Sequence, residues 1–90
     1  MDGQNGTQPA LGDSDTSFEV ALEILDGLVA YAARRISSER AEADSDAIAL
    51  WEHRRDEWVR RRRELRPRDG LAVRAVLEDD GAFLRSLPTG

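Results

Sequence analysis

A run of apolar residues with heptad spacing is the feature that most constrains how this chain folds. Intervals of four, three, four, three and four residues separate Phe18, Leu22, Leu25, Val29, Ala32 and Ile36. An α-helix returns to the same side about every 3.6 residues, so these side chains form one continuous stripe. The stripe is widened by Ala21, Ile24, Leu28 and Tyr31. A stripe this wide is typical of a helix that packs against more than one neighbour.

The residues before this run predict no fold of their own. Residues 1–15 are rich in Gly, Asp, Asn and Gln and contain little apolar surface, which is too little to offset the entropy lost on ordering. We therefore expect a disordered tail over residues 1–15. Thr16 and Glu19 have the spacing of a capping box, which predicts that the first helix begins there. Gly27 within the run either permits a close helix approach or is incidental, at a cost of about 1 kcal/mol relative to alanine.

A second helix is expected over about residues 46–65. Seven-residue intervals separate Trp51, Trp58 and Leu65, which places them on one helix face. The residues Asp44, Ser45 and Asp46 offer caps for its start. The two helices, 16–44 and 46–66, then form an antiparallel hairpin. One long continuous helix is the alternative, because the polar residues between the two contain no Gly or Pro.

The C-terminal part predicts a short helical segment over residues 69–87. Arg66 precedes Pro67 and ends the second helix, and Asp69 can cap a third helix from Gly70 to about residue 78. The residues Asp79, Asp80 and Gly81 are expected to interrupt that helix. The predicted fold is therefore all-α, with a single domain over 16–87 and tails at 1–15 and 88–90. The two tryptophans are expected where the last segment folds back on the hairpin.

Composition narrows the classes of function. The 90 residues contain no cysteine and one histidine, so a disulfide is excluded and we expect no metal or cofactor. The serines have only His53 as a base, and no glycine-rich phosphate loop is present, so we expect no enzyme activity. No apolar run is long enough to span a membrane, and no signal peptide is visible; we expect a cytoplasmic protein. Thirteen arginines without a lysine indicate GC-rich coding DNA and a bacterial source.

The charge is unevenly distributed along the chain. The formal net charge is -5, residues 1–32 contain six acidic residues and no arginine, and residues 51–68 contain eight arginines and four acidic residues. Helical spacing predicts one basic patch from Arg54, Arg55, Arg61 and Arg62. This patch is either a binding surface, with nucleic acid as the less favoured partner, or a solvated helix end whose arginines complement the helix dipole.

The apolar stripe of the first helix is longer than the second helix can cover. Such a surplus predicts self-association or a docking groove. We expect a non-catalytic protein–protein interaction module, an adaptor or regulatory subunit that forms a homodimer. The residues predicted to bind the partner are Leu22, Leu25, Val29, Trp51, Arg54, Arg55, Trp58, Arg61 and Arg62.

One short pattern suggests an alternative function. Ser38 and Glu42 lie four residues apart after the amphipathic run, which predicts that both lie on one helix face. This resembles the Ser/Thr-x-x-x-Glu inhibitory helix of small antitoxins that silence Fic-type AMP-transferases. The family pattern continues with Gly or Asn after the glutamate, whereas Ala43 follows here. The resemblance implies an inhibitor in which Glu42 enters the nucleotide site of a target enzyme and pairs with an arginine there.

Overall fold

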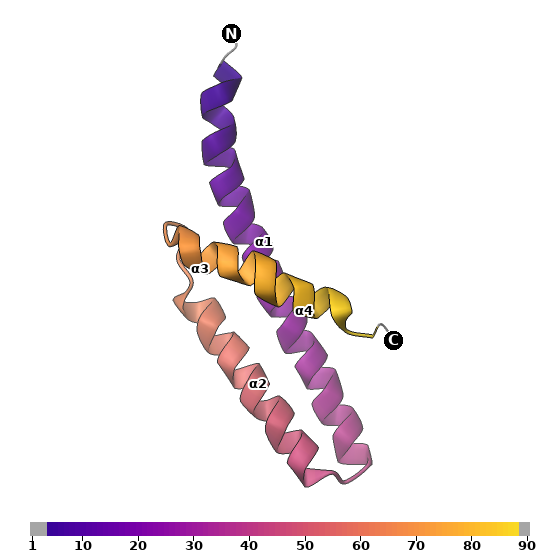
Figure 1. Ribbon diagram of the computed structural model, residues 1–90. Helices are drawn as coiled ribbons and strands as arrows, with labels where there is room; N and C mark the ends of the chain where they lie inside the picture. Colours follow the sequence, from indigo (N-terminus) through magenta and orange to yellow (C-terminus); the bar gives the residue numbers. More distant parts are fainter. Residues whose placement is uncertain (1–3, 89–90) are drawn as a thin grey trace.

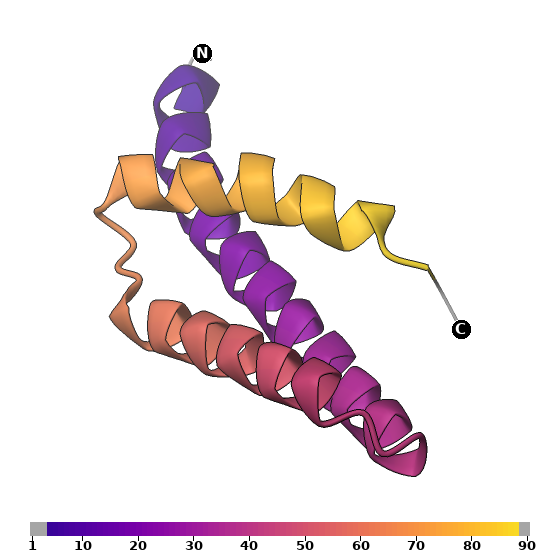
Figure 2. The same cartoon turned by 60° about the horizontal axis from the view of Figure 1, so that its bottom comes forward.

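The computed structural model describes residues 4–88, with side chains described from Thr16 to Pro88. Helix α1 spans Gln4–Ala41 and α2 spans Ser45–Glu64. A C-terminal helix then runs without a break through α3 (Gly70–Ala75), the π-helical turn η1 (Val76–Asp80) and α4 (Gly81–Ser86). Helices α1 and α2 lie side by side and antiparallel, and the C-terminal helix crosses α1 (Figures 1 and 2). The predicted all-α fold, a helical hairpin with a C-terminal helical segment, is confirmed.

The predicted start of the first helix at Thr16 is wrong, because α1 begins at Gln4. A capping box satisfies the amide groups of a first helical turn, but a preceding helical turn satisfies the same groups with its carbonyls. The early turns of α1 project beyond the other helices in Figure 1. They contain Gly6, Pro9 and Gly12, residue types that disfavour helix interiors. The disorder predicted for residues 1–15 is not tested by this geometry and stays a prediction.

A tight turn after Ala41 excludes the alternative of one long helix. The amide of Asp44 donates to the carbonyl of Glu39, and the amide of Ala43 donates to that of Arg40, at 3.1 Å each. This is a Schellman motif, with Ala43 in the left-handed conformation at φ 57° that such a motif requires. The carboxylate of Asp44 then accepts from the amide of Ala47 and caps α2. The first helix therefore ends three residues before the predicted bound at residue 44.

The core lies where α2 and the C-terminal helix both pack on α1. Its buried side chains are Ala21, Leu25, Leu28, Tyr31, Ala32, Ile36, Trp51, Trp58, Leu65, Val73 and Val76. Leu22 and Val29 of the predicted stripe are only half-buried, whereas Leu28, expected at its edge, is fully buried. The buried stripe is rotated because α1 has a second neighbour on the side of Leu28.

The predicted interruption at residues 79–81 is wrong, since the C-terminal helix continues through them. The helix takes a wider π-helical turn in η1, just before Gly81. Two glycines then allow this helix to cross α1 closely. A Cβ atom on Gly81 would lie 3.3 Å from Cδ1 of Ile24, and one on Gly27 would lie 3.2 Å from Cδ2 of Leu84. Gly27 therefore permits a close helix approach, which was one of its two expected roles.

No helix among the described residues is both long and apolar enough to cross a membrane. The predicted cytoplasmic location is not tested by that finding and stays a prediction.

Candidate functional site

Three of the residues predicted to bind a partner are buried within the chain itself. Leu25 is inaccessible to solvent, and Trp51 and Trp58 are 8% and 7% exposed. Trp58 lies under the C-terminal helix, with its ring centroid 6.0 Å from that of Phe83, as expected for the tryptophans. Trp51 instead meets the ring of Tyr31 edge-on at 5.5 Å. These three side chains belong to the core of the single chain.

The structure divides the four arginines that helical spacing predicted as one basic patch. The predicted face is centred on Trp51 and Trp58, which are packed against α1, so the arginines flank it on two sides. Arg61 pairs with Asp80 of the C-terminal helix at 2.5 Å, and Arg62 pairs with Asp26 of α1 at 2.5 Å. The predicted single patch is therefore wrong, because the centre of that helix face is core.

Arg54 and Arg55 flank the same buried face one helical turn after Trp51. Arg54 lies over the Trp51 ring, and Arg55 pairs with Asp56 at 3.1 Å. Within the following arginine run, Arg60 pairs with both Glu57 and Glu64. Most of these arginines thus have intramolecular carboxylate partners, as in the interpretation of a solvated helix end. Nucleic-acid binding by this segment is not tested and stays a prediction.

One side of the hairpin is left uncovered by the C-terminal helix. Successive residues on a helix are about 100° apart, so Leu22 and Val29 lie on a different side of α1 from Ile24 and Gly27, which meet the C-terminal helix. On this side, ion pairs between described side chains join α1 to α2: Asp26 pairs with Arg62 at 2.5 Å and Arg40 with Glu52 at 3.7 Å. We call this surface the open face and define it by the half-buried apolar side chains Leu22, Val29, Ile48 and Val59.

The other side of the hairpin carries a group of arginines on aromatic rings that sequence reasoning missed. The guanidinium carbons of Arg54 and Arg35 lie 4.8 Å and 5.3 Å from the Trp51 ring centroid, and that of Arg34 lies 5.7 Å from the Tyr31 centroid. We call these five residues the arginine–aromatic cluster. The sequence already places Arg34 three residues after Tyr31 and Arg54 three residues after Trp51. Only the packing of α1 on α2 brings Arg35 onto a ring of the other helix.

The Ser38 and Glu42 pattern does not lie within one regular helix. Ser38 is in the last turn of α1, whereas Glu42 lies in the turn beyond its final residue, Ala41. The premise that both occupy one helix face is therefore corrected, because the Schellman motif ends the helix before Glu42. Both side chains are exposed. The inhibitory role implied by the resemblance is not tested and stays a prediction.

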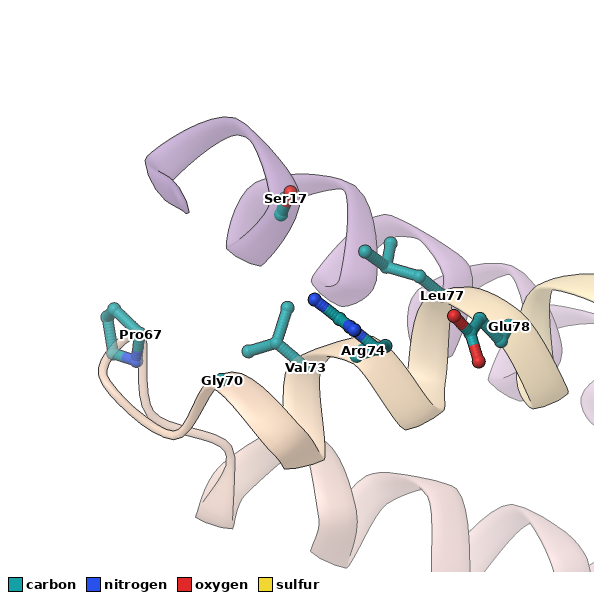
Figure 3. A pocket seen from close by; sticks show the side chains of 7 residues that line it. All are labelled: Ser17, Pro67, Gly70, Val73, Arg74, Leu77 and Glu78. Atoms are coloured by element: carbon teal, nitrogen blue, oxygen red, sulfur yellow. The ribbon is translucent and has the colours of Figure 1, made fainter. Parts of the chain in front are cut away.

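Two grooves flank the C-terminal helix. The groove between α1 and α3 has a volume of about 370 Å³, and Figure 3 shows Arg74 extending from α3 towards α1 between Val73 and Leu77. A second groove of about 400 Å³, between the end of α2 and α3, includes Arg61 and Leu65. The first groove is lined by Ser17, Pro67, Gly70, Val73, Arg74, Leu77 and Glu78, a set without a paired nucleophile and base.

The electrostatics of the described residues do not mark a reaction centre. No polar or charged residue between Thr16 and Pro88 is fully buried, and no group of three or more potential metal ligands occurs there. The hydrogen bond from Arg60 lowers the pKa of the Glu57 carboxyl below its ordinary value. The hydroxyl of Tyr31 and the carboxylate of Glu39 both raise the pKa of the Arg35 guanidinium. Each shift has an ion-pair or hydrogen-bond cause at the surface, which is common in structural ion pairs.

Comparison of the chain with protein-family models, with curated proteins and with solved structures found no match.

Proposed function

We propose that this chain is a non-catalytic protein–protein interaction module that self-associates through its open face. The supporting observation is the line of half-buried apolar side chains on α1 and α2, over which no third helix of residues 4–88 lies. When two hairpins pack face to face, the helices form a four-helix arrangement, a common way for amphipathic hairpins to bury such a line. A two-fold axis makes the same patch serve in both copies.

The proportions of the chain support the same proposal. Its Cα radius of gyration is 16.6 Å, whereas a compact domain of ninety residues has a radius of about 12 Å. An elongated chain buries less apolar surface internally, and domains this small are marginally stable without further burial. A second copy on the open face would supply that burial.

Size-exclusion chromatography with light scattering tests the proposal. We expect the natural chain to elute as a dimer at micromolar concentration. The variant Ala33→Arg places a bulky charge one turn beyond Val29, at a position that is exposed in the single chain, so folding is spared and the dimer dissociates. Val29→Asp should dissociate it as well, with helix content checked by circular dichroism.

The matched control is Val20→Asp. Val20 is also on α1 and is 40% exposed, but it lies on the side away from Leu22 and Val29. We expect this variant to remain dimeric. A natural chain that is monomeric at this concentration, or equal dissociation by Val20→Asp and Val29→Asp, would refute self-association through the open face.

A further inference from the structure

We propose that the arginine–aromatic cluster binds an acidic segment of a partner protein, and that an apolar side chain of that segment packs on Leu50. The cluster lies on the opposite flank of α2 from Ile48 and Val59, so this site is separate from the open face. It also lies closer to the hairpin turn than the crossing of the C-terminal helix, since that crossing is at Gly27.

Cation–π contacts with aromatic rings restrain the guanidinium groups before any ligand arrives. Arg35 and Arg54 come from different helices and both lie over the ring of Trp51, at 5.3 Å and 4.8 Å. Trp51 is itself fixed by its edge contact with Tyr31. A guanidinium held over a ring keeps its N–H donors, which lie in its own plane, free to bond at its edge. Less side-chain entropy is then lost when a carboxylate binds.

The charge of the cluster is only partly balanced within the described side chains. Glu39 pairs with Arg35 at 2.7 Å, whereas Arg34 and Arg54 have no ion pair with any side chain between Thr16 and Pro88. The Nε atom of Arg35 is buried without a hydrogen-bond partner among the described residues. Two unmatched guanidinium groups favour a ligand that carries at least two carboxylates.

The surroundings favour an acidic peptide over a nucleic acid. Trp51 is 8% exposed, so no nucleotide base can stack on it, and base stacking is the usual contribution of aromatic residues to single-strand binding. Leu50, one turn before Arg54 on α2, is 46% exposed and offers an apolar contact that a phosphate chain would not use.

Fluorescence anisotropy with a defined probe tests this assignment. The probe is a fluorescein-labelled peptide in which pairs of glutamates alternate with single leucines, measured at low salt with the full chain. We expect saturable binding that Arg54→Gln and Arg34→Gln each weaken roughly fivefold, the value of one well-placed charge pair. Leu50→Ser should weaken binding by a similar factor. The matched control is Arg68→Gln, which removes the same charge from the loop after α2.

The outcomes separate this proposal from self-association. Binding to the Ala33→Arg chain should equal binding to the natural chain, because the two surfaces lie on opposite sides of the hairpin. The proposal is overturned if the peptide does not bind, or if Arg68→Gln weakens binding as much as Arg54→Gln. It is also overturned if a labelled oligothymidylate of equal charge binds more tightly than the peptide.

Discussion

Both sides of the α1–α2 hairpin carry apolar side chains, but the C-terminal helix covers only one of them. On the side of Ile24 and Leu28, the C-terminal helix covers the hairpin, and Gly27 and Gly81 let the backbones approach. On the open face no helix of the described part of the chain covers Val29 and its apolar neighbours, and exposed ion pairs border them. An apolar stripe on a helix is therefore necessary for burial but does not determine which of its edges is buried. The edge that is buried is the one against which a neighbouring helix packs closely.

The largest expected effect comes from truncating adjacent residues on the two sides. Leu28→Ala should reduce the free energy of unfolding by about 3 kcal/mol, because Leu28 is fully buried and its loss leaves a cavity. Val29→Ala should cost about 1 kcal/mol or less, because Val29 is half-buried. Urea denaturation followed by circular dichroism, at low protein concentration so that self-association contributes least, gives both values. Equal losses would show that the open face is as well packed as the covered side.

A second test places a larger side chain where the C-terminal helix crosses α1. Gly81→Leu should cost about 1–3 kcal/mol, because even a Cβ atom there would lie 3.3 Å from both Ile24 Cδ1 and Arg85 Nη1, and a larger side chain must displace the C-terminal helix. Ala30→Leu adds a comparable side chain at an exposed position of α1 and should change stability by less than about 0.5 kcal/mol. Thermal denaturation of both variants measures the contrast. A neutral Gly81→Leu variant would mean that the crossing is loosely packed.

Ion pairs on the two sides sharpen the comparison further. Arg61 and Asp80 are 33% and 14% exposed in their side chains, whereas Arg62 and Asp26 are 45% and 55% exposed. Double-mutant cycles with alanine should give a larger coupling energy for Arg61 with Asp80. The value for Arg62 with Asp26 should be near the lower end of the 0.2–1 kcal/mol range (roughly) of exposed pairs and should vanish in high salt. The reverse order would show that solvent screening does not separate the two sides.

The smallest expected effect concerns Glu57, which lies on the solvent side of α2. Because Arg60 lowers the pKa of this carboxyl in the folded chain, its ionised form stabilises the fold at neutral pH. That contribution is lost as the pH falls through the lowered pKa. Glu57→Gln should therefore be slightly less stable than the natural chain at pH 7 and equal to it in acid, as measured by urea denaturation across that range. A difference that grows on acidification would contradict the sign of the shift.

Local sequence signals were sufficient to predict the helices, the hairpin and most of the residues at which the helices begin and end. Heptad spacing identified α1, Asp44 and Asp69 cap the following helices as expected, and Pro67 follows the end of α2. These features depend on interactions within a few residues, such as a cap's hydrogen bond or the steric effect of proline, so they can be read from a linear pattern. The start of α1 was missed because a capping box does not exclude an earlier helical turn.

Only the tertiary structure decided which surfaces remain available to a partner. Trp51 and Trp58 are core residues, the arginines on either side of them face different neighbours, and Arg35 reaches a ring on another helix. Each of these outcomes depends on the rotation of α1 towards two neighbours and on the close crossing at Gly27 and Gly81. The sequence by itself determined that the chain is a set of amphipathic helices. Contacts between residues far apart in the chain determined which edge of each helix is covered, because burial depends on the fit between surfaces and not on the order of residues.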